Sequence, residues 1–245
     1  MQGLKPLEKY CIHRIVYQPV MSLHSGMVYK LEALSRFFNS QGEALPVFDV
    51  IKDLENIGSI KAATYLVIDS VVNFLVKLND KKISFNLSHL LLGDYETIDY
   101  LINKCLEYSL CIRNIEIEIN ENITPDDLII HLNFLDYIKD RGLLIALDDF
   151  GIGMLQEENL KDYKFDTIKI DRGIVNGIGK SRIKYERFLQ MLFFCLDSGA
   201  EVICEGIEDI EDLKMIPCCE KIGIQGFVFS GPLSEYDVIT LFPAK

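Results

Sequence analysis

The 245-residue sequence predicts an α/β protein, a closed (β/α)8 TIM-like barrel with one antiparallel strand near the amino terminus. Eight short apolar runs have the period of β-strands, and every gap from the second run onward holds a helical pattern. An open doubly wound sheet is the alternative, but such a sheet normally has a glycine-rich first turn, which this sequence lacks. Because no linker or change of composition divides the chain, we expect residues 1–245 to form a single domain.

The first two predicted strands are residues 15–23 and 28–37, and only a short segment containing "HSG" separates them. A connection of that length permits a hairpin, so these two strands should be antiparallel. The other predicted strands are residues 83–88, 115–122, 143–149, 165–171, 201–207 and 222–230. Helical patterns such as residues 59–79 and 182–199 would make the crossovers that join parallel neighbours.

Composition excludes several classes of function. The net charge of -12 argues against binding to duplex nucleic acid or to an anionic membrane surface, although a small anionic ligand could bind where cations gather in a cleft. Seven cysteines without a C-x-x-C pair indicate a reducing compartment rather than a disulfide framework or a cysteine-zinc site. No run reaches the roughly 18 apolar residues of a membrane span, and "MQGLKPLEKY" lacks the apolar core of a signal peptide. We therefore expect a cytoplasmic protein.

The segment "IEIEINEN", residues 115–122, alternates between apolar and acidic side chains. Residues two apart share a face of a strand, so the isoleucines should face the helices while Glu116 and Glu118 point into the barrel. A buried carboxylate is costly unless it is paired or bound to a metal. An edge strand with one wet face would show the same alternation, and this segment alone does not distinguish the two.

Polar residues recur on seven consecutive predicted strands, mostly near their carboxyl ends, where barrels of this kind place their active sites. They are Glu32, Asn86, Glu118, Asp148, Asp149, Lys169, Glu205 and Gln225. Five of the eight are carboxylates, and oxygen ligands favour Mg²⁺ or Mn²⁺ over zinc. The four histidines are scattered without metal-binding spacing.

Asp148 and Asp149 are adjacent like charges directly behind an apolar run. Two cations about 4 Å apart, bridged by one aspartate, would relieve their repulsion, activate water and stabilise an in-line displacement at phosphorus. Lys169 would then orient the water or offset phosphate charge, and a salt bridge to a rim carboxylate is compatible with that role. A surface turn in which water screens both aspartates is the alternative.

Eight ordered blocks of sequence resemble the EAL-domain family of cyclic di-GMP phosphodiesterases, named for the tripeptide found here at Glu32–Leu34. The blocks are "YQPV", "LEALSRF", "FNLS", "EIEINEN", "ALDDFGIG", "TIKIDR", "CEGIE" and "IQGFVFSGPL", and the likeness extends from about residue 12 to the carboxyl terminus. The resemblance implies a stand-alone EAL domain that forms a barrel with a reversed strand and hydrolyses cyclic di-GMP to linear pGpG with Mg²⁺ or Mn²⁺. It also implies a homodimer.

The resemblance implies the following roles, position by position. One ion would bind Glu32, Asn86, Glu118 and Asp148, and the second would bind Asp148, Asp149 and Glu205. Lys169 would contact the attacking water, and Gln225 would support the site. Glu121 would steady the loop after the fifth predicted strand, residues 143–149. Gln18 and Arg36 would approach the phosphates or bases of the substrate. Glu205 is therefore expected to serve both as a ligand and in catalysis.

The sequence departs from the family pattern in the loop Ile152–Asn159, where Ile152 and Met154 replace a common Thr and Tyr, and at Gly231, where an Arg is frequent. These changes affect no expected metal ligand, but they bear on rate, regulation and dimerisation. They keep open a second hypothesis, an EAL-like adaptor or nucleotide receptor that acts through an unidentified protein partner. A barrel glycosidase fits less well, because a lysine and an asparagine lie among the acids and the chain has no Trp to stack on sugars.

Overall fold

The computed structural model describes residues 12–78, 81–120, 123–155, 158, 160 and 163–243. Its strands are β1 (Ile12–Ser22), β2 (Val28–Phe38), β3 (Ala44–Leu45), β4 (Lys82–Leu87), β5 (Ile115–Asn120), β6 (Leu144–Phe150), β7 (Thr167–Ile170), β8 (Glu201–Cys204) and β9 (Ile222–Ile224). The strand order is β1-β9-β8-β7-β6-β5-β4-β2-β3, and an additional pairing of β1 with β2 closes the sheet into a barrel. The predicted (β/α)8 barrel is therefore confirmed and the open sheet is excluded.

The reversed strand is β1. It runs antiparallel to β2, where Gln18 lies opposite Glu32, and antiparallel to β9 on its other side. The pairings from β2 through β4 to β9 are all parallel. The predicted hairpin is thus confirmed, and its turn contains Gly26 with a positive φ of 67°, a conformation that glycine adopts without strain. As a consequence, the carboxyl ends of the parallel strands lie at one rim of the barrel, together with the start of β1.

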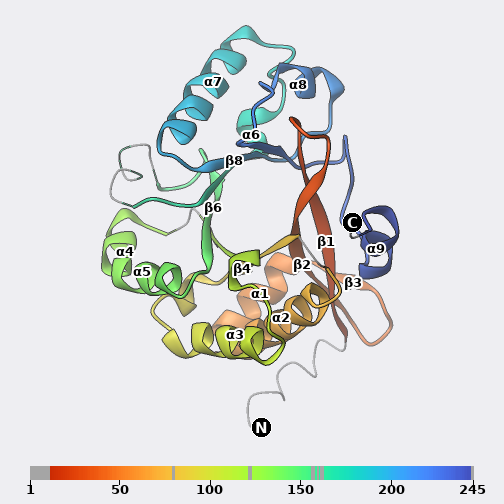
Figure 1. The fold of residues 1–245 in the computed structure, drawn as a ribbon, viewed down its shortest axis with the longest axis vertical. Coiled ribbons are helices and arrows are strands. Elements are labelled where there is room, and N and C mark those ends of the chain that lie inside the picture. Colours follow the sequence, from red (N-terminus) through yellow and green to blue (C-terminus); the bar gives the residue numbers. More distant parts are fainter. Residues whose placement is uncertain are drawn as a thin grey trace.

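Helices surround the strands on the outside (Figure 1). They are α1 (Val47–Asn56), α2 (Ile60–Leu75), α3 (Tyr95–Glu107), α4 (Pro125–Ile130), α5 (Leu132–Asp140), α6 (Arg172–Val175), α7 (Arg182–Asp197), α8 (Ile210–Met215) and α9 (Glu235–Leu241). The expected helix between β6 and β7 is missing from the described residues 151–155, 158, 160 and 163–166. No helix in the described part of the chain is both long enough and apolar enough to cross a membrane.

Strand β5 shows how the sequence pattern sorts side chains between the helices and the barrel interior. Ile115, Ile117 and Ile119 belong to the hydrophobic core, as the alternation predicted. Glu116 and Glu118 are both 0% exposed, so the strand has no wet face and the edge-strand alternative is excluded. Burial of these two carboxylates requires partners inside the barrel.

The partners form two layers along the inner wall, because residues two apart on one strand point to the same side. We call Lys30, Glu116 and Thr167 the lower layer. We call Glu32, Glu118, Lys169 and Gln225 the upper layer. All seven side chains are at most 6% exposed. The strands β2, β5 and β7 each contribute one residue to the lower layer and the residue two positions later to the upper layer.

Candidate metal centre

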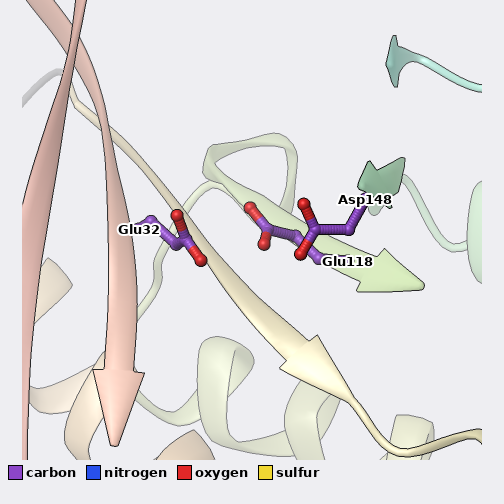
Figure 2. Close-up of side chains that lie close together, drawn as sticks. All are labelled: Glu32, Glu118 and Asp148. Atoms are coloured by element: carbon purple, nitrogen blue, oxygen red, sulfur yellow. The ribbon is translucent and has the colours of Figure 1, made fainter. Parts of the chain in front are cut away.

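Five carboxylates gather at the rim where the parallel strands end, and we call them the acidic cluster. They are Glu32, Glu118, Asp148, Asp149 and Glu205. They form two groups that share Asp148: Glu32 with Glu118 and Asp148, and Asp148 with Asp149 and Glu205, and within each group one oxygen per residue lies within 4.8 Å of the others. Figure 2 shows the carboxylates of the first group facing one another from β2, β5 and β6. Each group could hold a metal ion.

A β-bulge in β6 brings the adjacent residues Asp148 and Asp149 to the same site. Successive residues of a regular strand point to opposite faces, which would separate these two carboxylates. The pairing of β6 with β7 shifts between Leu147 and Phe150, and Asp149 has a φ of 53°. Asp is one of the few residues other than glycine that adopts this left-handed conformation at modest cost. The bulge therefore lets the neighbouring carboxylates of Asp148 and Asp149 point to the same site.

Lys169 lies in the middle of the acidic cluster. Its Nζ lies 2.7 Å from Glu205 Oε1, 2.9 Å from Glu118 Oε2, 2.9 Å from Asp148 Oδ1 and 3.3 Å from Glu32 Oε2. One ammonium among five ionised carboxylates leaves an excess of four negative charges. Two divalent cations would balance this excess. The salt bridge that the sequence allowed for Lys169 is confirmed.

Burial and mutual repulsion perturb the ionisation of these groups. Burial, reinforced by Glu32, holds the pKa of Glu118 well above its usual value, although Lys169 opposes the shift. Burial likewise raises the pKa of Glu205 well above normal. Burial raises the pKa of Asp149 to about 6, with a contribution from the neighbouring Asp148. The carboxylates therefore bind protons tightly when no cation compensates their charge.

Two amides contact the first carboxylate group, and Asn86 would present its Oδ1 in place of its Nδ2 to bind a cation. Gln225 Nε2 donates to Glu32 Oε2 at 2.6 Å, while Asn86 Nδ2 makes long contacts of 3.4 Å to Glu32 Oε1 and Glu118 Oε2. Oε1 of Glu118 is buried and lacks a hydrogen-bond partner among the described residues. Hard oxygen donors, excess negative charge and this unpartnered oxygen fit Mg²⁺ or Mn²⁺.

The other predicted residues lie at or outside the edge of the acidic cluster. Gln18 Nε2 donates to the carbonyl of Ser230 at 3.5 Å, and its backbone pairs with Glu32. Arg36 Nη1 donates to the carbonyl of Ser35 at 2.7 Å, and Arg36 lines a cavity of about 660 Å³. Asn86 and Asn120 line the same cavity. Glu121 lies outside the described residues.

Sequence reasoning missed one residue that contacts the acidic cluster. Asn120 Nδ2 donates to Asp149 Oδ2 at 3.3 Å. The same alternation that placed Glu118 on the inner face also placed Asn120 there, so the signal was present in the sequence. The hydrogen bond connects the end of β5 to the bulge in β6.

The two departures from the family pattern have different surroundings. Ile152 and Met154 are each 59% exposed, so the loop that follows the acidic cluster presents apolar side chains to solvent. At Gly231, a Cβ atom would lie 3.0 Å from Cε1 of Phe227. A larger residue at position 231 would therefore require the Phe227 ring to move.

Comparisons with known proteins identify the family and the fold. The EAL domain model matches residues 12–232. Cyclic di-GMP phosphodiesterase PdeR of Escherichia coli is 27% identical over 226 residues, and the match covers 89% of this chain and 34% of that protein. The uncharacterised protein sll1895 of Synechocystis is 28% identical over 247 residues, and the match covers 94% of this chain and 34% of that protein. The chain thus spans about a third of the length of these relatives. The phosphodiesterase domain of PaMucR, solved with cyclic di-GMP, superposes with a TM-score of 0.85 at 22% identity and covers 97% of this chain and 100% of that one.

Proposed function

Because the chain belongs to the EAL domain family, we propose that it hydrolyses cyclic di-GMP to linear pGpG with two divalent cations, Mg²⁺ or Mn²⁺. The observation that carries this proposal is the pair of carboxylate groups that share Asp148. Glu32, Asn86, Glu118 and Asp148 would hold one cation, and Asp148, Asp149 and Glu205 would hold the other. When bound, such a pair supplies an activated water and stabilises negative charge on the phosphate oxygens.

The product defines the bond that breaks. A linear pGpG keeps its phosphate on the 5′ oxygen, so water attacks phosphorus and the 3′ oxygen of the neighbouring ribose leaves and takes up a proton. Lys169 is buried among the carboxylates and has an ammonium group fixed by Glu205, Glu118 and Asp148. Asp148 and Glu118 keep Lys169 protonated by raising its pKa well above normal, which outweighs the effect of burial. As an ammonium group it can orient the water and offset phosphate charge.

The supporting residues act on the carboxylates or on the substrate. Gln225 fixes one oxygen of Glu32 through its 2.6 Å hydrogen bond. Gln18 pairs with Glu32 and Arg36 lines the same cavity as Asn86, and their side chains would approach the phosphates or bases of the nucleotide. Glu121 would steady the loop after β6, and a homodimer remains a prediction from the family resemblance.

The test is turnover by the purified chain. Incubation with cyclic di-GMP and Mn²⁺ or Mg²⁺ should yield pGpG, measured by chromatography of the nucleotides. Glu32→Ala should abolish the product, because it removes a carboxylate from the first group. Glu107→Ala, at an exposed position on α3, is the matched control and should react like the wild type. Absence of turnover by the wild type with either cation, at neutral and at alkaline pH, would defeat the proposal.

The exposed side chains of Ile152 and Met154 favour a second candidate, an adaptor or nucleotide receptor that acts through a protein partner. Apolar side chains on a surface loop beside a binding site are typical of a contact surface. Calorimetry that shows nucleotide binding without a metal requirement, together with intact nucleotide after hours of incubation, would support this candidate over the enzyme.

A further inference from the structure

The lower layer is a closed set of polar contacts directly beneath the acidic cluster. Lys30 Nζ donates to Glu116 Oε2 at 2.6 Å and to Thr167 Oγ1 at 3.1 Å, and Thr167 Oγ1 donates to Glu116 Oε1 at 2.6 Å. Lys30 and Glu116 are 0% exposed and Thr167 is 1% exposed. The fourth position of this layer, Gly223 on β9, has no side chain, and a Cβ there would collide with the hydroxyl of Tyr29. A residue larger than glycine at position 223 would therefore require Tyr29 to move.

The lower layer lies one step below the residues that would hold the first cation. Lys30 precedes Glu32 by two residues on β2, and Glu116 precedes Glu118 by two residues on β5. Two residues of a strand span roughly 7 Å, so a charge in the lower layer acts on the upper layer with little screening by solvent, because both layers are buried. Without Lys30, the inner wall would carry a further carboxylate beneath Glu118, and the acidic cluster would extend down the barrel.

We propose that Lys30 is a positioning residue for the metal centre: by neutralising Glu116, it confines divalent cations to the acidic cluster and keeps Glu32 and Glu118 directed toward them. The inference rests on the proposed metal site and does not depend on the identity of the substrate. It assigns a role to a buried ion pair that takes no part in holding the cations or contacting the nucleotide.

The experiment measures Mn²⁺ binding to the whole chain by calorimetry, with the melting temperature recorded separately. Glu116→Gln keeps the shape of the side chain and removes its charge, which leaves the Lys30 ammonium uncompensated beneath the cations. The Kd for Mn²⁺ should rise by about tenfold or more. In the double variant Lys30→Met/Glu116→Gln, both charges are absent, and the Kd should return to within about threefold of the wild type.

A matched control uses the exposed ion pair between Lys77 and Glu235, whose Nζ and Oε2 lie 2.8 Å apart. Lys77→Met, Glu235→Gln and the double variant repeat the same chemical changes far from the barrel interior. None of them should alter the Kd, since exposed ion pairs are screened by solvent.

The inference would be overturned by a Kd of Glu116→Gln for Mn²⁺ within twofold of the wild type. It would also be overturned by a double variant that binds Mn²⁺ as weakly as Glu116→Gln. Failure of both variants to fold would overturn it too, because the ion pair would then be needed for folding alone. A wild type that binds no Mn²⁺ would overturn it as well. A wild type that binds Mn²⁺, shows the expected pattern of Kd values and leaves cyclic di-GMP intact would support the inference and defeat only the proposed phosphodiesterase activity.

Discussion

The two polar layers inside the barrel draw on the same strands, but their charges balance differently. In the lower layer, the Glu116 carboxylate meets the Lys30 ammonium and both contact the Thr167 hydroxyl. In the upper layer, Lys169 lies among the acidic cluster and cannot neutralise it. Buried charge alone therefore does not identify a functional site in this protein. The distinguishing property is charge that the protein's own side chains leave uncompensated.

The difference predicts which layer depends on an added cation. A buried ion pair whose hydrogen bonds are all made needs no added cation to balance its charge. A buried carboxylate oxygen without a hydrogen-bond partner raises the free energy of the folded protein. Oε1 of Glu118 is such an oxygen among the residues that the structure describes. Variants in the two layers should therefore separate effects on cation binding and turnover from effects on stability.

The largest effect is expected from Lys169→Met. Removing one member of a buried ion pair costs about 3–5 kcal/mol of stability, here in the metal-free protein. Turnover should fall by about 10²–10³-fold, the range typical of losing one group that stabilises developing negative charge, while Mn²⁺ still binds because its carboxylate ligands remain. Steady-state kinetics and calorimetry measure the two effects, with Lys77→Met as the control. Turnover within threefold of the wild type would show that Lys169 has only a structural role.

Removal of divalent cations should come next. Cations at a hundred times their Kd would stabilise the protein by about 2.7 kcal/mol relative to protein in EDTA, measured by scanning calorimetry. The effect should be larger at pH 8 than at pH 5. Burial raises the pKa of Asp149 to about 6 and holds the pKa of Glu118 and Glu205 well above normal.

The sign of the pH dependence follows from linkage. A carboxyl group whose pKa is higher in the folded than in the unfolded state favours folding at low pH, so the metal-free protein loses stability as pH rises from about 4 through 6 and beyond. Cations bind the ionised form and compensate this loss. An equal effect of EDTA at both pH values would contradict the assignment of the cations to the acidic cluster.

Thr167→Val should affect the lower layer without altering its charge. The variant loses the hydroxyl that donates to Glu116 and accepts from Lys30, at a cost of about 1–3 kcal/mol in the free energy of unfolding. The Kd for Mn²⁺ should stay within threefold of the wild type. Thr240→Val, at an exposed helical position, is the control and should have little effect. A loss of Mn²⁺ affinity would mean that hydrogen bonding, and not charge, couples the two layers.

The smallest effect concerns the bulge. Asp149→Asn and Asp149→Ala both remove the charge, but Asn adopts the left-handed conformation of this position at lower cost than Ala. The Asp149→Ala variant should therefore be less stable than Asp149→Asn by about 1 kcal/mol, measured by urea unfolding in EDTA. Ser109 has a similar φ of 54° far from the metal centre, and Ser109→Asn and Ser109→Ala should follow the same order. Equal stability of the two Asp149 variants would mean that the bulge relaxes when the carboxylate is lost.

The barrel could be predicted because its elements are local. The alternation in "IEIEINEN" is enough to direct Glu116 and Glu118 inward, and the short connection after β1 is enough to reverse that strand. The connection between β6 and β7 could not be predicted in the same way. Its sequence is compatible with a helix, and the described residues there adopt none, because packing and not local preference decides such segments.

The acidic cluster could be predicted as a set of residues but not as a geometry. Nothing local in "ALDDFG" indicates that Asp149 adopts a positive φ, since the bulge arises from the pairing of β6 with β7. Lys30 escaped prediction for another reason. A lysine two positions before Glu32 is an ordinary surface residue until the partner carboxylate, 86 residues away on β5, is known to face it.

The reversed direction of β1 determines where a fused domain would be attached. Ile12 pairs with Phe38 at the end of β2, so the chain enters the barrel at the rim that holds the acidic cluster. A ligand-responsive module joined directly to Ile12 would therefore lie at that rim, where its movement could obstruct access. The same module inserted in the turn at Ser25 would project from the opposite end.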